Sequence, residues 1–351
     1  MKNQWVLAIV IITAPSLRAG SFNSAANGTT VSDFLRLGTS ARALAMGGAF
    51  SALVDDASAN FWNPAALTNI PSQSATFMHA AYINSSTFDY GAYGHSLGRY
   101  GALGVDFKYF SVGKEMTQTD ALGSELGSFK PYDLAASVGY AYKLKGLEAA
   151  PLGVLNGFSL GLALKFVQSR ILTTAKTSAV DIGVLSPRYF NDRLKLALTA
   201  TNIGGPLRYE QASESLPLTF TAGSAFKIKD RWLSSLDIIF PRSGDPVAAM
   251  GTEYWLPTRS QWEFAGRAGF NTETINSIDG LAGFSMGTAV GFGDCRVDYA
   301  FVPMGGLGLT QWISLTYKFS PKAPTYRHRR PSRMPSSIWS GRARVVESPR
   351  S

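Results

Sequence analysis

The sequence predicts an all-β chain that forms a transmembrane antiparallel β-barrel of about fourteen strands. Three observations lead to this fold class. From about residue 74 to 319, runs of 8 to 13 residues alternate in polarity and are separated by turn signals. Only 16% of the residues are charged, whereas 12% are aromatic. After the first twenty residues, no apolar run reaches the roughly 18 residues that a membrane-spanning helix needs. Strands that face lipid on one side account for all three.

The runs can be assigned to fourteen strands, an even number, as expected when both ends of a bacterial barrel lie on one side of the membrane. The expected strands are 74–83, 87–96, 100–110, 133–144, 157–169, 178–186, 195–202, 218–227, 232–240, 248–255, 261–270, 281–288, 295–301 and 310–319.

The alternation is clearest in the run 133–144. Leu134, Val138 and Tyr142 fall on one face of this strand, and Asp133 and Ser137 fall on the other. A soluble β-sandwich also alternates, but it does not usually need fourteen such strands in a row. The pattern therefore favours the barrel.

The connection lengths support the same interpretation. The long connections 111–132, 203–217, 271–280 and 302–309 fall on one side of the barrel, which we expect to be the outside. The short links 97–99, 228–231 and 256–260 fall on the periplasmic side. The links 145–156 and 289–294 are longer than this pattern predicts.

Both ends of the chain differ from the barrel. Residues 1–19 have the features of a signal peptide. Lys2 precedes an apolar core, and Leu17–Ala19 is the expected cleavage site. Residues 320–351 form a basic tail, rich in Pro, Ser and Arg, that we expect to be disordered. The sequence leaves open whether the tail binds anionic polymer or is an artefact of the reading frame.

The charge and the reactive residues argue against several function classes. The net charge is +9, of which the tail contributes +7 and the signal peptide +2, so residues 20–319 are close to neutral and predict no nucleic-acid surface. One cysteine, Cys295, allows no internal disulfide and no cysteine-based zinc site. Gly47-Gly48 lacks the context of a phosphate loop. His79 and His95 have no evident serine partner. We therefore expect no cofactor and no enzymatic activity.

The segment before the barrel carries a family resemblance. The run 37–67 contains Arg42 in a stretch of small residues, then Asp55-Asp56, then Asn63-Pro64-Ala65. Together with 132–144, 202–217, 251–254 and 297–315, it resembles the PorV/PorQ-type outer-membrane proteins of the wider FadL-like family. The resemblance covers nearly everything from about 30 to 319. It implies a hatch, or plug, over residues 20–73 inside a barrel of residues 74–319, in the outer membrane of a Gram-negative-type bacterium. Arg42, Asp55, Asp56, Asn63, Pro64 and Ala65 would be the hatch motif. The basic tail departs from the family pattern.

Charged residues on the expected inner face form a second candidate site. We expect them to pair with one another and to bind Arg42, Asp55 and Asp56 of the hatch; the alternative is that they face water in a wide pore. They are Asp106, Lys108, Asp133, Lys143, Lys165, Asp181, Asp237, Glu253, Glu263, Arg267, Arg296, Asp298 and Lys318.

The resemblance implies one of two functions. The first is protein secretion, as a cargo shuttle or attachment component of a type IX-like system whose partners are secretion proteins and their cargo. The second is FadL-like transport of long-chain fatty acids or other hydrophobic small molecules. Both place the barrel in contact with outer-membrane lipid. Secretion predicts partner-binding loops at 111–132 and 203–217, whereas transport predicts an apolar pocket under the outer loops and a gap in strand pairing.

Overall fold

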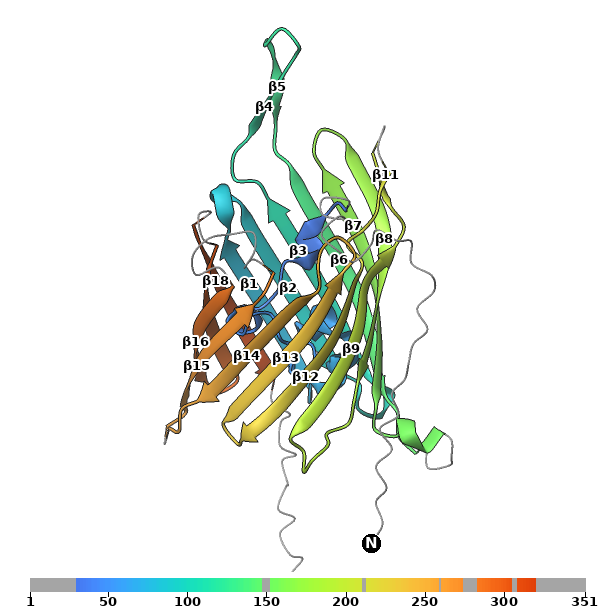
Figure 1. Cartoon of the computed structure of the whole chain (residues 1–351), viewed down its shortest axis with the longest axis vertical. Coiled ribbons are helices and arrows are strands. Elements are labelled where there is room, and N and C mark those ends of the chain that lie inside the picture. The colour runs from blue at the N-terminus through green and yellow to red at the C-terminus, as the bar shows by residue number, and fades with distance from the viewer. Residues whose placement is uncertain are drawn as a thin grey trace, which may run out of the picture. The chain divides into compact units, whose positions relative to one another are not determined.

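Fourteen antiparallel strands close into a barrel, which confirms the predicted fold class and strand number (Figure 1). The computed structural model describes residues 30–146, 152–209, 213–258, 260–273, 283–304 and 308–319; the predicted signal peptide and tail lie outside them. The barrel strands are β1 (Gln73–Ala81), β2 (Thr87–Ser96), β3 (Ala102–Ser111), β6 (Tyr132–Lys143), β7 (Ser159–Arg170), β8 (Thr174–Leu185), β9 (Leu194–Gly204), β12 (Thr219–Lys229), β13 (Trp232–Pro241), β14 (Val247–Trp255), β15 (Trp262–Asn271), β16 (Phe284–Phe292), β17 (Cys295–Pro303) and β18 (Leu309–Phe319).

The barrel closes between its first and last strands. β1 pairs with β18 from Gln73 opposite Phe319 to Ala81 opposite Gln311, so that each strand has two hydrogen-bonded neighbours. β8 and β9 shift register between Val180 and Ile182. At this bulge Asn202 has a φ of 60°, a left-handed conformation that asparagine tolerates better than most residues.

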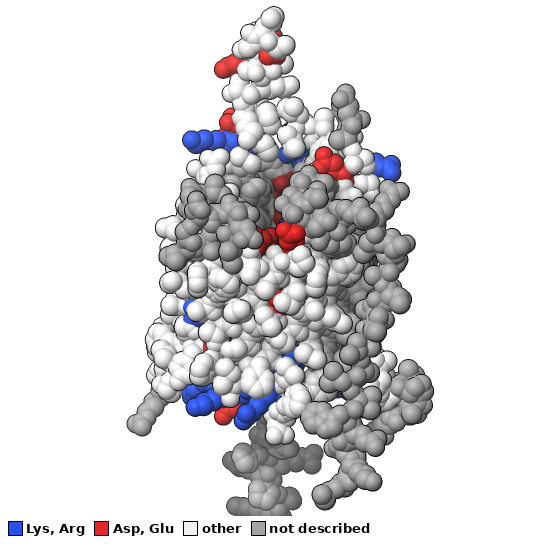
Figure 2. All heavy atoms as spheres, in the orientation of Figure 1, with Lys and Arg blue, Asp and Glu red and all other residues white. Residues whose placement is uncertain are grey.

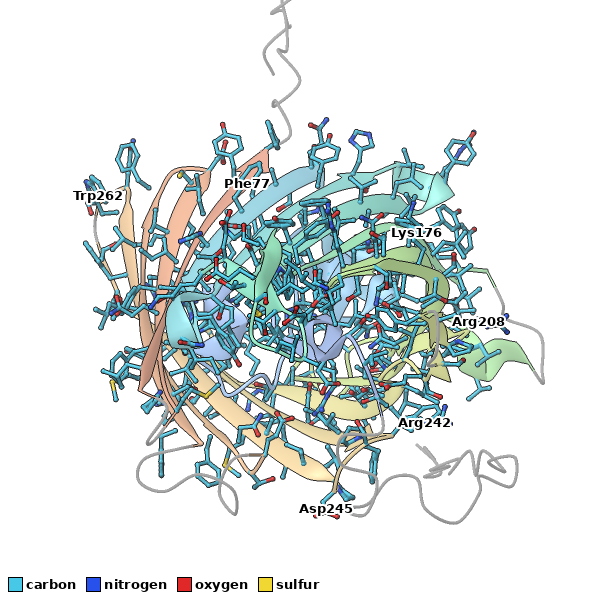
Figure 3. All side chains as sticks on the ribbon, turned by 90° about the horizontal axis from the view of Figure 1, so that it is seen from above. Phe77, Lys176, Arg208, Arg242, Asp245 and Trp262 are labelled. Carbon is cyan, nitrogen blue, oxygen red and sulfur yellow. The ribbon has the colours of Figure 1, made fainter. Side chains whose placement is uncertain are left out.

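The outer wall is apolar because alternate residues of each strand point away from the lumen. Phe77 and Trp262 point outward from the ring of strands in Figure 3. Figure 2 shows that the wall facing the viewer is mostly uncharged between its two charged ends. This pattern is typical of a wall that faces lipid. None of the helices in the described part of the chain is both long and apolar enough to cross a membrane.

The longest predicted connections contain structure of their own. Residues 112–131 contain a hairpin, β4 (Met116–Thr119) and β5 (Glu125–Phe129), which extends beyond the ring of strands (Figure 1). We call this end of the barrel the hairpin end and the opposite end the turn end. A second hairpin, β10 (Leu207–Arg208) and β11 (Ser213–Glu214), follows β9. Short 3-10 helices, η4 (Ile83–Ser85), η5 (Gly98–Tyr100) and η6 (Leu152–Leu155), lie in other links.

One predicted link was wrong. The interval 289–294 is not a long connection, because β16 continues to Phe292 and β17 begins at Cys295. The sequence analysis ended the preceding strand at residue 288, but Gly291 lies within β16 and pairs with Arg296. Gly293 has a φ of 58° and makes the turn with Asp294. The link is therefore two residues long, like the link 230–231 between β12 and β13.

Residues 30–72, which we call the N-terminal segment, contain four short helices. These are η2 (Asp33–Arg36), α1 (Ala41–Leu44), α2 (Ala59–Trp62) and η3 (Pro64–Asn69). η3 contacts β2, β3, β6, β7 and β8, whereas α1 contacts β16, β17 and β18. The helices, drawn in blue, lie within the ring of strands in Figure 3. The segment thus contacts strands on two sides of the barrel.

Candidate functional site

The N-terminal segment can be buried because many of its residues are small and its central turn is hydrogen-bonded. Ala41, Ala43 and Ala45 have no exposed surface. Asn63 adopts the extended conformation that a following proline favours, and its side-chain oxygen accepts a hydrogen bond from the Ala65 backbone N–H at 3.0 Å. Asn63 thus caps η3 and fixes the turn between α2 and η3.

On one side, the segment rests on inward-facing glycines, which we call the glycine seat. A methyl group on Gly161 would lie 2.1 Å from the Ala65 backbone nitrogen, and one on Gly183 would lie 2.1 Å from Oδ1 of Asn63. Such distances exclude any side chain without movement of the segment. The glycine seat consists of Gly94, Gly104, Gly139, Gly161 and Gly183 on β2, β3, β6, β7 and β8.

On the other side, the segment meets charged residues of β14, β15, β17 and β18, which we call the charged seat: Glu253, Arg267, Arg296, Asp298 and Lys318. Arg42 of the segment donates to both carboxylate oxygens of Glu253, at 2.8 and 2.7 Å. Arg267 donates to the same carboxylate at 2.7 Å, so one buried acid binds two guanidinium groups.

The ion pairs continue from the wall back to the segment. Arg267 lies 2.9 Å from Asp298, and Asp298 accepts from Arg296 at 2.8 Å. Arg296 reaches Asp56 of the segment at 3.0 Å. Asp55 pairs with Arg42 at 2.8 Å and with Lys318 at 3.1 Å. Four acids and four bases therefore form one connected network between the segment and the wall: Asp55, Asp56, Glu253, Asp298, Arg42, Arg267, Arg296 and Lys318.

Other inward-facing charges hold the segment without ion pairs. Asp237 accepts hydrogen bonds from the backbone N–H groups of Phe50 at 3.1 Å and Ser51 at 3.0 Å. The carboxylate of Asp106 accepts from the side-chain amide of Asn60. Each acid therefore binds a polar group of the segment.

The two buried lysines have different partners. Lys108 lies 3.6 Å from the ring centre of Phe61, a cation–π contact, and donates to the carbonyl of Leu35 at 3.4 Å. Lys165 pairs with Asp181 at 2.7 Å, within the wall. It also donates to Asn202 at 2.7 Å, beside the β8–β9 bulge.

Not every inward-facing charge forms an ion pair. Among the described residues, Asp106, Lys108 and Asp237 have no ion pair and use the contacts above. Asp133, Lys143 and Glu263 also form none. Asp133 is half-buried and accepts a hydrogen bond from Ser169. Lys143 and Glu263 lie on the inner face near the ends of their strands, where they are exposed. Alternation gives the face of a residue but not its depth in the lumen.

The glycine seat was missed by the sequence analysis, although a signal existed. Gly139 and Gly161 lie on the inner face of β6 and β7, opposite a row of large outward-facing side chains such as Tyr140 and Leu162. Glycine within a strand marks close approach of another backbone. The recurrence of such positions on neighbouring strands could have predicted where the segment lies.

A cavity of about 450 Å³ lies between the N-terminal segment and the wall. Its apolar lining includes Leu35, Leu37, Phe61 and Trp62 of the segment and, from the wall, Ile239, Val247, Val302 and Trp312. Its polar lining includes Thr199, Thr201, Thr219 and Thr221, with Lys165, Asp181 and Asn202 beside the bulge. A space of this size and lining suits a small, mostly apolar molecule.

His79 and His95, the two histidines in the described residues, make no contact that indicates catalysis. His79 bonds to Asp89 at 2.7 Å, and His95 lies 3.4 Å from the Tyr93 hydroxyl. Neither of these hydrogen bonds involves a serine. No group of three or more His, Cys, Asp or Glu residues in the described part of the chain is arranged to hold a metal ion.

The fold and the internal contacts define a closed barrel with an ordered segment packed against its inner wall. Residues 22–232 match the family described as Type IX secretion system protein PorV. This match covers more than half of the chain, and the chain belongs to the PorV family. Families of this kind are secretion or transport barrels of the outer membrane. No curated protein matches the chain.

Solved structures of transport proteins share the fold. The Pseudomonas putida toluene transporter TodX has a TM-score of 0.55 and 12% identity, over 80% of this chain and 98% of its own. The Ralstonia pickettii toluene transporter TbuX has a TM-score of 0.54 and 12% identity, over 81% and 99%. A Pseudomonas aeruginosa FadL homologue has a TM-score of 0.53 and 12% identity, over 80% and 98%. At this identity, the likeness shows the fold alone.

Proposed function

We propose that the protein acts in secretion as a partner-binding barrel and not as an open pore or an enzyme. The observation that carries this proposal is the N-terminal segment, which is held on two sides of the lumen by the glycine seat and the charged seat. In this proposal the N-terminal segment is the hatch. The residues that bind it to the barrel wall are Arg42, Asp55, Asp56 and Asn63-Pro64-Ala65. Membership in the PorV family, which is described as a type IX secretion family, supports the same role.

The β4–β5 hairpin is the element that we propose for partner binding. Nearly all its residues are exposed, and it stands alone as a two-stranded sheet (Figure 1). Such a hairpin is marginally stable without a partner, and its free edges offer unpaired backbone groups. Leu122 at its tip is 92% exposed and Leu126 is 61% exposed. Exposed apolar side chains on a free hairpin fit a protein partner.

Affinity purification from solubilised outer membranes tests this role. The tagged wild-type protein should co-purify with large secreted proteins or a translocon, and Leu122→Ser with Leu126→Ser should lose them. The matched control is Ile171→Ser with Leu172→Ser, because these exposed apolar residues lie in the β7–β8 link at the same end of the barrel. Equal recovery of protein partners from both variants would contradict the proposal.

The cavity of about 450 Å³ supports a second candidate function, transport of hydrophobic small molecules. Part of its lining is apolar, and the β8–β9 register shift lies beside it. The strand ladder of the barrel is nevertheless closed, which disfavours a lateral exit. Recovery of a bound fatty acid or another apolar ligand, without protein partners, would favour transport over secretion.

A further inference from the structure

An outward-facing glycine interrupts the apolar wall between two phenylalanines. Gly91 of β2 lies opposite Phe77 of β1 and Phe107 of β3 in the strand register. Along β2, the next outward-facing residues are Asp89 and Tyr93. Phe77 points away from the barrel in Figure 3. The missing side chain therefore leaves a slot on the outer wall, which we call the Gly91 slot.

A polar pair lies at the end of the slot nearer the hairpin end of the barrel. Nδ1 of His79 and Oδ1 of Asp89 are 2.7 Å apart, and the two side chains are 62% and 48% exposed. Asp89 pairs in register with Tyr109, whose ring centre is 5.8 Å from that of Tyr132. Tyrosines at strand ends are typical of the membrane interface. The polar pair therefore lies at the level of lipid headgroups, with the apolar slot below it.

The other end of the slot is closed by an aromatic ring. Tyr93 stacks on His95 with ring centres 6.3 Å apart and an interplanar angle of 25°. From Asp89 to Tyr93 the strand rises by about 13 Å. Aliphatic residues of β3 and β18 complete the lining: Val105, Ile313 and Leu315. The slot is thus elongated and mostly apolar in its lining, with the His79–Asp89 pair at the end nearer the hairpin end.

We propose that the Gly91 slot binds one membrane lipid from the leaflet at the hairpin end. One acyl chain lies over Gly91 between Phe77 and Phe107, and the headgroup contacts His79 and Asp89. The Asp89 carboxylate accepts hydrogen bonds, so it selects a headgroup that carries an amine or hydroxyl donor. The described residues that line the slot include no lysine or arginine, which disfavours a headgroup that offers only phosphate.

Photolabelling of the full chain in nanodiscs tests the site. The probe is a phosphatidylethanolamine with a diazirine in its acyl chain, and the labelled peptides are identified by mass spectrometry. We expect labelling to concentrate in peptides that contain Phe77, Gly91 and Phe107. Gly91→Leu should reduce it about tenfold, because the new side chain occupies the space of at least two methylene groups.

Gly91→Leu has a matched control in Gly266→Leu. Gly266 also faces outward, with nothing within 4 Å of an added Cβ, whereas a Cβ on Gly91 makes an ordinary van der Waals contact with the Phe77 ring at 3.6 Å. Both variants should therefore fold. Gly266→Leu should leave the labelling unchanged. Asp89→Asn should weaken labelling by the phosphatidylethanolamine probe but not by a phosphatidylcholine probe, whose headgroup has no N–H or O–H donor. Uniform labelling around the wall, or equal labelling of the two leucine variants, would overturn the proposal. So would cross-linking of a protein at the slot in native membranes.

Discussion

The two seats hold the same segment by different physical means. On the β2–β8 side, glycine backbones approach Asn63 and Ala65 closely, and uncharged groups of the segment, such as the Asn60 amide, bind charged wall residues by hydrogen bonds. None of the ion pairs among the described residues joins the segment to these strands. On the β14–β18 side, Arg42 and Asp56 enter a network of buried charges. Glycines also approach the segment on the charged side, where a methyl group on Gly269 would lie 2.0 Å from the Gly47 nitrogen. The comparison teaches that close backbone packing is common to both walls, whereas, among the described residues, buried ion pairs join the segment to only one of them.

Adding a side chain to the glycine seat should have the largest effect. Gly161→Val places methyl groups against the Ala65 backbone, which cannot rotate away, so we expect a loss of more than about 4 kcal/mol in the free energy of unfolding. Chemical denaturation in detergent and protease cleavage of the segment measure the effect. The matched control is Gly266→Val on the outer wall; equal stability of the two variants would show that the glycine seat is not a tight contact.

Removing Glu253, the acid that Arg42 and Arg267 share, should have the second-largest effect on the free energy of unfolding. Glu253→Ala leaves Arg42 and Arg267 buried without their common partner, which should cost about 3–5 kcal/mol in the free energy of unfolding. Glu263→Ala removes an exposed acid of the inner face and should change stability by less than about 0.5 kcal/mol. A small effect at Glu253 would mean that shape alone holds the segment.

Loss of the Asp237 contacts should have an intermediate effect on the free energy of unfolding. Asp237 belongs to neither seat. Asp237→Ala leaves the N–H groups of Phe50 and Ser51 without their acceptor, and we expect a loss of about 1–3 kcal/mol. Asp237→Asn keeps one acceptor oxygen and should lose less. Hydrogen exchange at the two amides checks the assignment, and unchanged protection in Asp237→Ala would refute it.

The smallest effect is expected at the exposed edge of the charged network. Asp55 is 43% exposed, so its pairs with Arg42 and Lys318 are partly screened by solvent. Asp55→Asn should cost about 1 kcal/mol or less, and the difference from wild type should shrink as salt is added. Thermal unfolding at low and high salt measures it. A loss as large as that of Glu253→Ala would place Asp55 at the centre of the network.

The sequence predicted the barrel well because its signal is local. A strand of period two shows which residues share a face, and the fourteen strands followed from that alone. The same rule placed Glu263 with Arg267 because both face inward, although only Arg267 is buried.

The docking of the segment could not be predicted in the same way. The position of the segment within the barrel determines which wall carboxylate binds Arg42. It also determines that Asp237 accepts hydrogen bonds from backbone N–H groups. The alternation that identifies these inward-facing residues carries no information on that placement.

Disulfide formation between the segment and the wall tests the central claim most directly. The side-chain oxygens of Thr68 and Ser159 are 2.8 Å apart, so Thr68→Cys with Ser159→Cys in a Cys295→Ser background should cross-link in intact outer membranes. Thr68→Cys with Ser285→Cys is the control, because Ser285 bonds to Gly47 on the other side of the segment. The account predicts a disulfide in the first variant only. No cross-link in the first variant, or cross-links in both, would contradict a segment held between two seats.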